Sequence, residues 1–220
     1  MTHDRWLRTA ALLLAAGLAL AGGGCGSVLP KPEPTPAFFA LDGLSAARAA
    51  APSAAGLTLI VNQPQAVAGF DGQHIVYLRQ DHQLEHFAHS VWVDTPARML
   101  APLIADAVTR GDTIRNAVLP TGTAAAELRL DTQIVRLQHD FSSRPSHVRF
   151  TLRATLLDDA TRHVLATREF DESVAAASDD PYGGVVAANQ AVQTVLRALA
   201  AFCDESARQW QQTQGASPMH

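Results

Sequence analysis

Residues 147–170 read HVRFTLRATLLDDATRHVLATREF, and this stretch decides the fold class. From Val148 to Leu156 apolar residues alternate with arginine or threonine, which is the period-two pattern of a strand with one buried face. The sequence Asp-Asp-Ala-Thr at 158–161 favours a turn, and a weaker alternation follows over 163–174. We therefore predict two antiparallel strands joined by a tight turn.

Further strands are predicted on the N-terminal side of this pair. Alternation over 127–137 adds a third strand to the meander. The run at 57–61 is rich in β-branched residues and is ended by Asn62 and Pro64, so it predicts a strand that enters a core, and 74–79 predicts another. The sequence thus predicts a sheet of four to six strands.

Two amphipathic helices are expected beside the sheet. Each begins at a proline that follows good capping residues, Pro96 after Asp94 and Thr95, and Pro181 after Asp180. Pro102 inside the first helix should bend it. Apolar residues at helical spacing give each helix one face to bury: Met99, Leu100, Leu103, Ile104, Ala107 and Val108, and then Val185, Val192, Leu196, Leu199, Phe202 and Cys203. We predict an α+β fold, an antiparallel or mixed sheet with the two helices packed on one face.

The N-terminus has the layout of a signal peptide. Arg5 and Arg8 precede an apolar run at 10–21, which spans about 18 Å as a helix and falls short of the roughly 30 Å hydrocarbon core. Small residues then lead to Cys25, in a context that resembles a bacterial lipobox. We predict that Cys25 carries the lipid anchor; the alternative is an ordinary signal peptide with Cys25 left as a free thiol.

The remaining chain divides into a tether, one domain and a tail. Prolines crowd residues 26–36 and favour an extended spacer, and the Ala-rich segment 45–55 is interrupted by helix breakers. We expect a signal peptide at 1–24, a lipidated tether at 25–56, the folded domain at 57–205 and a flexible polar tail at 206–220.

The charge argues against a nucleic-acid-binding protein, and the cysteine content argues against a domain held by internal disulfides. The chain carries 17 basic and 21 acidic side chains, and the part after residue 24 has a net charge of about −5 without a basic stripe, which argues against nucleic-acid binding. Cys25 and Cys203 are the two cysteines, so a lipidated Cys25 leaves no internal disulfide. Cys203 is expected as a small buried residue of the last helix.

No catalytic or metal centre is predicted. His82, His86 and His89 would share one helical face, with His74 nearby, but scattered surface histidines explain them better than zinc ligands do. His139, Asp140 and His147 lack a nucleophile-elbow motif, and the chain has no P-loop. The pair Asp179 and Asp180 is better explained by helix capping than by ligand binding. We therefore expect no enzyme activity, no metal and no cofactor.

The segment 69–92 carries the candidate contact residues. It places Phe70, Tyr77, Phe87 and Trp92 among glycine and polar residues, a composition typical of protein interfaces. We predict that these four aromatic residues meet a partner. The alternative is that they complete the core.

Three segments carry a family resemblance: GFDGQHIVYLRQDHQLEHFAHSVWVDTPARML at 69–100, LRLDTQIVRLQHDF at 128–141 and SDDPYGGVVAANQAV at 178–192. They resemble the ABC-type transport auxiliary lipoprotein family, the PqiC-like lipoproteins. The resemblance implies a periplasmic lipoprotein, held in the outer rather than the inner membrane. It would work with an MCE-domain protein and an ABC permease and ATPase to move lipids between the membranes. Bound lipid and self-association are compatible with this role, and catalytic residues are not part of the pattern.

Two other functions stay open from the residues alone. A lipoprotein of similar layout could act as chaperone or plug of an outer-membrane β-barrel, as the lipopolysaccharide-assembly lipoprotein does. A secreted hydrolase is the second alternative. Composition and periodicity by themselves predict a tethered α+β domain and do not predict its function.

Overall fold

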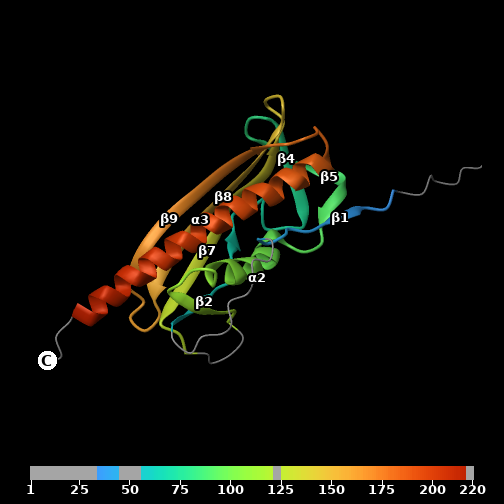
Figure 1. Cartoon of the computed structure of the whole chain (residues 1–220). Coiled ribbons are helices and arrows are strands. Elements are labelled where there is room, and N and C mark those ends of the chain that lie inside the picture. The colour runs from blue at the N-terminus through green and yellow to red at the C-terminus, as the bar shows by residue number, and fades with distance from the viewer. Residues whose placement is uncertain (1–33, 45–55, 121–124, 217–220) are drawn as a thin grey trace, which may run out of the picture. The chain divides into compact units, whose positions relative to one another are not determined.

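The computed structural model describes residues 34–44, 56–120 and 125–216 of the chain (Figure 1). The described elements all belong to one compact unit that begins at Pro36. The signal peptide, Cys25 and most of the tether, which the sequence predicts, lie outside the described residues.

The described residues form one mixed sheet of nine strands, more than the four to six that the sequence predicts. Three of the additional strands are short, and the shortest has two residues, too few for a periodic pattern to be recognised. The fourth, at Gln83–Trp92, has ten residues, but its apolar residues have helical rather than strand spacing. The strands are β1 (Ala37–Phe39), β2 (Leu57–Val61), β3 (Gln65–Ala66), β4 (His74–Gln80), β5 (Gln83–Trp92), β6 (Ile114–Val118), β7 (Leu128–Asp140), β8 (His147–Asp158) and β9 (Val164–Ala175).

Strand β7 is the centre of the sheet. One of its edges pairs antiparallel with β8, and β8 pairs antiparallel with β9, which confirms the predicted meander. The other edge of β7 pairs in parallel with three strands in succession, β2, β3 and β4. Strands β5 and β1 then follow β4, and β6 follows β2, so β1 and β6 end the two branches of this side.

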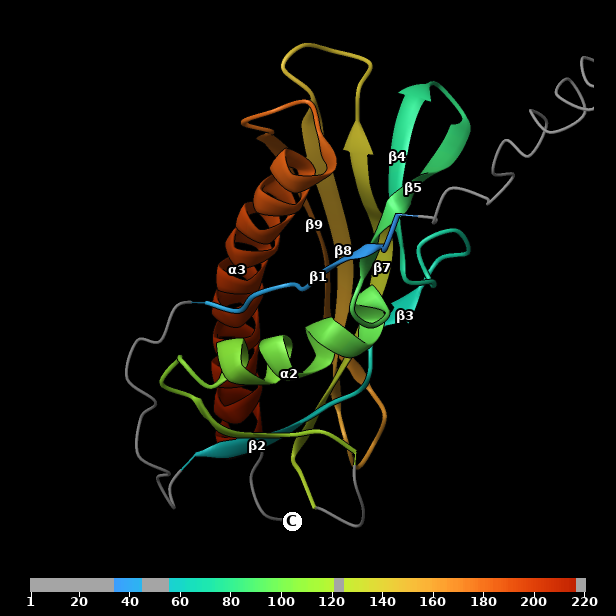
Figure 2. The ribbon, with the colours of Figure 1, turned by 90° about the vertical axis from the view of Figure 1, so that its right-hand side faces the viewer.

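Two helices share the core with the sheet: α2 (Pro96–Val108) and α3 (Pro181–Ala216). Both begin at the predicted prolines, although Thr95 makes no side-chain hydrogen bond to the end of α2. Helix α2 continues through Pro102. Helix α3 runs along β8 and β9, and α2 crosses beside it (Figure 2). By length and composition α3 could also cross a membrane, but half of its apolar stretch is buried against the rest of the domain.

The alternation in β8 separates a buried face from a polar face. Phe150, Leu152 and Leu156 are fully buried under α3, as the sequence predicts. On the opposite face, Arg149 and Arg153 form ion pairs with Asp171 and Glu169 of β9. The exposed face of the meander therefore carries ion pairs between β8 and β9.

The domain is longer at both ends than the predicted 57–205. Strand β1 pairs with β5, and Leu41 after it is buried, so the tether ends before Ala37. Helix α3 continues to Ala216, and Ala207 and Trp210 pack against the core, so residues 206–216 are not a flexible tail. The partner of β1 is distant in sequence, and the polar residues after 205 hide the apolar spacing of 203, 207 and 210, which explains both errors.

Candidate functional site

The predicted contact segment 69–92 folds as a loop followed by the β4–β5 hairpin. Phe70, Tyr77 and Trp92 are buried in the core, while Phe87 is half-buried. Core packing therefore accounts for three of the four aromatic residues. Only Phe87 presents appreciable ring surface that a partner could reach.

Phe87 belongs to a cluster of four rings at one end of the sheet. Its centroid lies 4.5 Å from that of Tyr77, and His139 and Phe141 at the end of β7 lie 4.1 Å from each other. Phe141 meets the edges of both Tyr77 and Phe87. The Tyr77 hydroxyl donates a 2.8 Å hydrogen bond to Glu85, and this bond raises the pKa of Tyr77. The cluster fixes β5 against β4 and β7.

His139 is a buried member of this cluster, and its burial was not predicted from the sequence. It is 2% exposed, and its Nε2 lies 2.8 Å from Oγ of the fully buried Ser146. Its Nδ1 has no hydrogen-bond partner among the described residues and faces Gly184 of α3, where an added Cβ would come within 2.4 Å. Burial lowers the pKa of His139, although Asp179 and Asp180 act in the opposite direction. Burial thus disfavours the protonated form of this ring.

Ser146 and His139 have the separation of a nucleophile and its general base. Both residues are buried, so a substrate cannot reach Ser146 in this conformation. In the part of the chain that the structure describes, no third group orients the ring through Nδ1. The pair is a packing feature of the junction between β7 and α3 rather than a catalytic dyad.

Asp179 and Asp180 cap and anchor the start of α3. The Asp180 carboxylate accepts a 2.8 Å hydrogen bond from Gly183 N, and Asp179 accepts one of 3.1 Å from Ser146 N. These bonds lower the pKa of both carboxyl groups. The capping interpretation is confirmed for Asp180, whereas Asp179 bonds to Ser146 and not to α3.

The histidines of the hairpin do not share a helical face, so the zinc-ligand arrangement, which was the less favoured interpretation, does not form. His82 occupies the turn after β4 with a φ of 67°, and His86 and His89 lie in β5. The His86 ring stacks on His74 at 4.8 Å. Within the described ranges, no group of three or more His, Cys, Asp or Glu residues could hold a metal ion.

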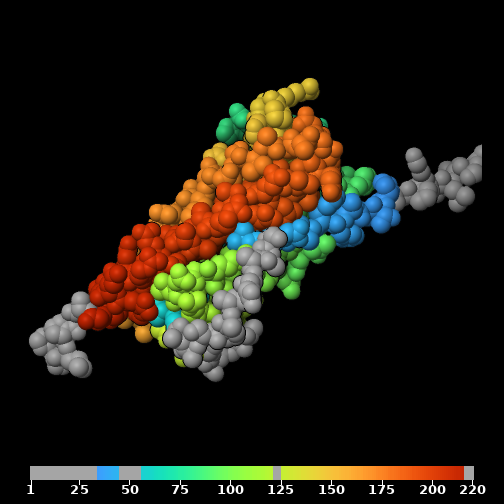
Figure 3. Space-filling model, viewed as in Figure 1, coloured from blue at the N-terminus to red at the C-terminus, as the bar shows by residue number. Residues whose placement is uncertain are grey.

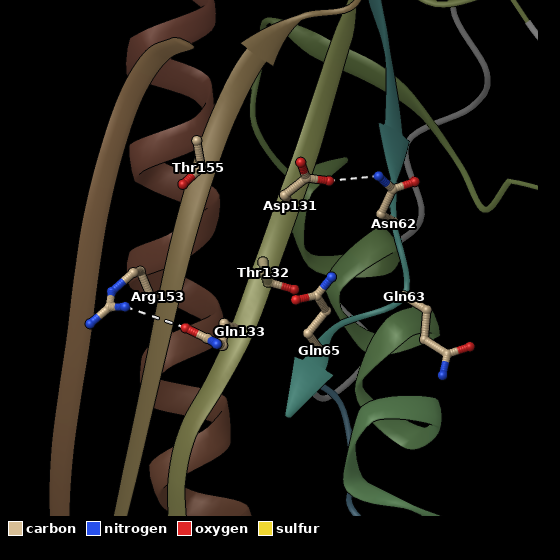
Figure 4. Close-up of a pocket in the computed structure, with 8 residues that line it drawn as sticks. All are labelled: Asn62, Gln63, Gln65, Asp131, Thr132, Gln133, Arg153 and Thr155. Atoms are coloured by element: carbon tan, nitrogen blue, oxygen red, sulfur yellow. Dashed lines mark hydrogen bonds between the residues drawn. The ribbon is translucent and has the colours of Figure 1, made fainter. Parts of the chain in front are cut away.

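A polar groove of about 550 Å³ lies where β2 and β3 meet β7 (Figure 4). Several of its side chains bond to one another: Asn62 donates to Asp131 at 2.6 Å, and Arg153 donates to Gln133 at 3.3 Å. The groove is lined by Asn62, Gln63, Gln65, Asp131, Thr132, Gln133, Arg153 and Thr155. These residues can form hydrogen bonds, but they include no serine, cysteine or histidine that could act as nucleophile with a base.

Cys203 is fully buried in α3, as predicted. Burial raises the pKa of its thiol to about 12, so it stays protonated and unreactive at neutral pH. Cys25, the predicted lipid attachment site, lies outside the described residues.

Comparison with known proteins gives a family and a fold. The family model of the ABC-type transport auxiliary lipoprotein component matches residues 39–200. The chain is similar to protein XCC0632 from Xanthomonas campestris with a TM-score of 0.71 at 20% identity, over 80% of this chain and 99% of that one. It is also similar to the hypothetical protein CT253 from Chlamydia trachomatis with a TM-score of 0.50 at 10% identity, over 70% and 98% of the two chains. No curated protein sequence matches the chain.

Proposed function

Since the chain belongs to the ABC-type transport auxiliary lipoprotein family, we propose that it is a non-catalytic periplasmic component of an ABC transport system that moves lipids between the two membranes of the envelope. The observation that carries this proposal is the family match, which spans most of the folded domain. The proposed partners are an MCE-domain protein and an ABC permease with its ATPase.

The non-catalytic role is supported by the chemistry of the described residues. The Cys203 thiol is buried and protonated, and the Ser146–His139 pair is inaccessible. The interior cavity between β4, β7 and α3 has a volume of about 10 Å³, which is room for no more than a water molecule. A lipid acyl chain does not fit there, so we propose that this domain supports transport without enclosing the lipid at this position.

Membrane attachment is proposed through Cys25, in the outer rather than the inner membrane. The support is the short apolar run at 10–21, the small residues before Cys25 and the prolines after it. Several acyl chains on one residue give the stable anchoring that a single chain does not.

Partner contact is proposed for the segment 69–92, through Phe87 of the β4–β5 hairpin. Phe87 is half-buried and lies in a groove with Arg79 and Arg144. Its ring packs against the ring of Tyr77. Phe70, Tyr77 and Trp92 then act by holding the hairpin in place. A partly exposed aromatic ring that packs on neighbouring side chains is a favourable contact residue in a protein interface.

The anchor is tested by replacing Cys25 with serine. We expect wild-type protein to incorporate labelled palmitate and to sediment with membranes, while Cys25→Ser appears in the soluble periplasmic fraction without label. Cys203→Ser is the matched control and should remain lipidated and membrane-bound. A Cys25→Ser protein that stays with the membranes, together with an unmodified Cys25 in the wild type by mass spectrometry, would refute the anchor.

A further inference from the structure

Exposed apolar side chains gather at one edge of the domain. Three of the six large apolar side chains that are exposed in the described residues adjoin Phe39 of β1. Phe38 precedes it in the chain, Tyr182 at the start of α3 lies 6.5 Å away between ring centroids, and the Val93 amide donates a 2.7 Å hydrogen bond to the Phe39 carbonyl. We call Phe38, Val93 and Tyr182 the β1 edge. Figure 3 shows β1, in blue, at the surface beside α3.

Core packing does not explain these exposures. Phe38 and Phe39 point to opposite faces of β1, and Phe39 packs against the core while Phe38 is 62% exposed. Tyr182 is 66% exposed and Val93 is 50% exposed. Strand β1 ends its branch of the sheet, with β5 as its pairing neighbour. Phe38 is thus on one face of β1, and Tyr182, whose ring lies beside Phe39, is on the other face. Exposed apolar side chains that flank an edge strand on both faces can meet a lipid or a partner through that edge.

The chain order favours the membrane as the occupant of this surface. Ala37, the first residue of β1, follows Cys25 by twelve positions in the sequence. At about 3.1 Å per residue for a proline-rich segment, this tether reaches roughly 40 Å at most. The β1 edge is therefore the folded surface that follows the anchor most closely along the chain. Attachment by such a short tether gives it a high effective concentration at the bilayer.

The residue types fit the interfacial zone of a bilayer. Tyrosine places an apolar ring and a polar hydroxyl across the boundary, and phenylalanine and valine supply apolar area. The neighbouring carboxylates are already engaged, since Asp94 pairs with Arg98 at 3.2 Å and Asp180 caps α3. Among the described strands β1 pairs with β5 on one side and with no strand on the other, so its outer backbone groups need hydrogen bonds from solvent or headgroups, which restricts the contact to the headgroup region.

The opposite face of the sheet does not have this character. There Arg149 and Arg153 form exposed ion pairs with Asp171 and Glu169. These charges would lose solvation at a bilayer. We infer that the β1 edge rests on the surface of the membrane that holds the anchor, with Phe38 and Tyr182 among the headgroups. This inference rests on the proposed lipidation of Cys25. It orients the domain with its first strand toward the lipid and the far end of α3 away from it.

Fluorescence quenching by brominated lipid tests the orientation. Lipidated full-length protein carrying Phe38→Trp or Tyr182→Trp is reconstituted into vesicles of phosphatidylethanolamine and phosphatidylglycerol, with and without brominated phosphatidylcholine. The emission of the parent protein is subtracted, because Trp92 and Trp210 contribute to it. We expect the added tryptophan at either position to lose at least half of its emission to brominated lipid.

Val164→Trp is the matched control. Val164 is 49% exposed and lines a groove with Trp210, so it lies beside the last part of α3. The helix rise places Trp210 about 42 Å from Tyr182 along α3. Emission from position 164 should therefore be unchanged by bromination. Unquenched tryptophans at 38 and 182, or equal quenching at 164, would overturn the inference while lipidation by mass spectrometry stands. Failure of the protein to enter vesicles would instead refute the anchor itself.

Discussion

The Cα atom of Gly184 in α3 lies against the ring of His139 in β7, so that a Cβ at position 184 would come within 2.4 Å of His139 Nδ1. The contact brings the first turn of the longest helix onto the central strand of the sheet. It also leaves Nδ1 without a hydrogen-bond partner from any of the described residues. Two predictions about stability follow from this close approach.

Gly184→Ala should destabilise the domain. The new methyl group cannot fit unless α3 or β7 moves, and overpacking of this kind costs about 1–3 kcal/mol. Gly215→Ala is the control on the same helix. No atom of the described residues lies within 4 Å of its Cβ position, and position 215 adjoins the last residue of α3, so this change should alter the unfolding free energy by less than about 0.5 kcal/mol. Urea denaturation measures both changes. Equal effects of the two substitutions would contradict the close packing at Gly184.

Stability should decrease as the pH falls below about 6.5, the ordinary pKa of histidine. Burial lowers the pKa of His139 in the folded state, so the unfolded chain takes up a proton at a higher pH than the folded domain does. The contribution of His139 to the free energy of unfolding is therefore fully present above about pH 6.5, and it decreases as the pH falls toward the lower pKa of the folded state. His139→Gln should show a smaller difference in unfolding free energy between about pH 7.5 and about pH 5.5. An unchanged difference would mean that another group titrates.

Carboxylates act in a separate pH window. Asp158, Asp179 and Asp180 have a pKa below their ordinary value of 3.8 in the folded state. Their contribution to stability is present above that value and is lost as the pH falls through it. The effect of His139 can therefore be measured before these groups titrate.

Trp210→Phe tests whether the last part of α3 is held by the β8–β9 hairpin. The indole Nε1 donates a 3.2 Å hydrogen bond to the buried Asp158 carboxylate at the end of β8. We expect a loss of about 1–2 kcal/mol, typical of a hydrogen bond to a charged group that keeps its other donors. Gln209→Ala on the exposed side should change the unfolding free energy by less than about 0.5 kcal/mol. Similar values for both would show that residues beyond 205 do not contribute to the fold.

Tyr77 and Phe87 should respond differently to truncation. Tyr77→Ala removes a buried ring and should cost about 3–5 kcal/mol, while Phe87→Ala should cost roughly half as much because its ring is half-buried. Pull-down of the proposed MCE-domain partner should decrease with Phe87→Ala at a temperature where the variant remains folded by circular dichroism. Full binding by folded Phe87→Ala would remove this residue from the interface.

Local periodicity predicted the parts of the fold that are long and amphipathic. The alternation of Val148–Leu156 and the proline starts of both helices predicted the meander and its cover. Strands β1, β3 and β6 were missed because they are short and gain their hydrogen bonds from distant parts of the chain. Strand β5 was missed although it has ten residues, because its apolar residues at 84, 87, 88, 91 and 92 have helical spacing. No local pattern contains that information.

The site was harder to predict for the same reason. Four aromatic residues in one segment were an interface signal, yet pairing of β4 with β7 buries Tyr77, and this pairing depends on contacts more than sixty residues apart. The exposure of Phe38 and Tyr182 likewise depends on where β1 and α3 end in space. The glycine pair at 183–184, early in a helix, was the one local signal of the close contact with His139.

The most direct test of the proposed function is the set of proteins that copurify with the chain. Tagged wild-type protein is extracted from membranes with mild detergent, and its partners are identified by mass spectrometry, with Cys25→Ser as the matched soluble control. We predict that an ABC permease, its ATPase and an MCE-domain protein copurify with the wild type and are depleted with Cys25→Ser. Recovery of an outer-membrane β-barrel protein in their place, or of no transport component at all, would contradict the proposed role.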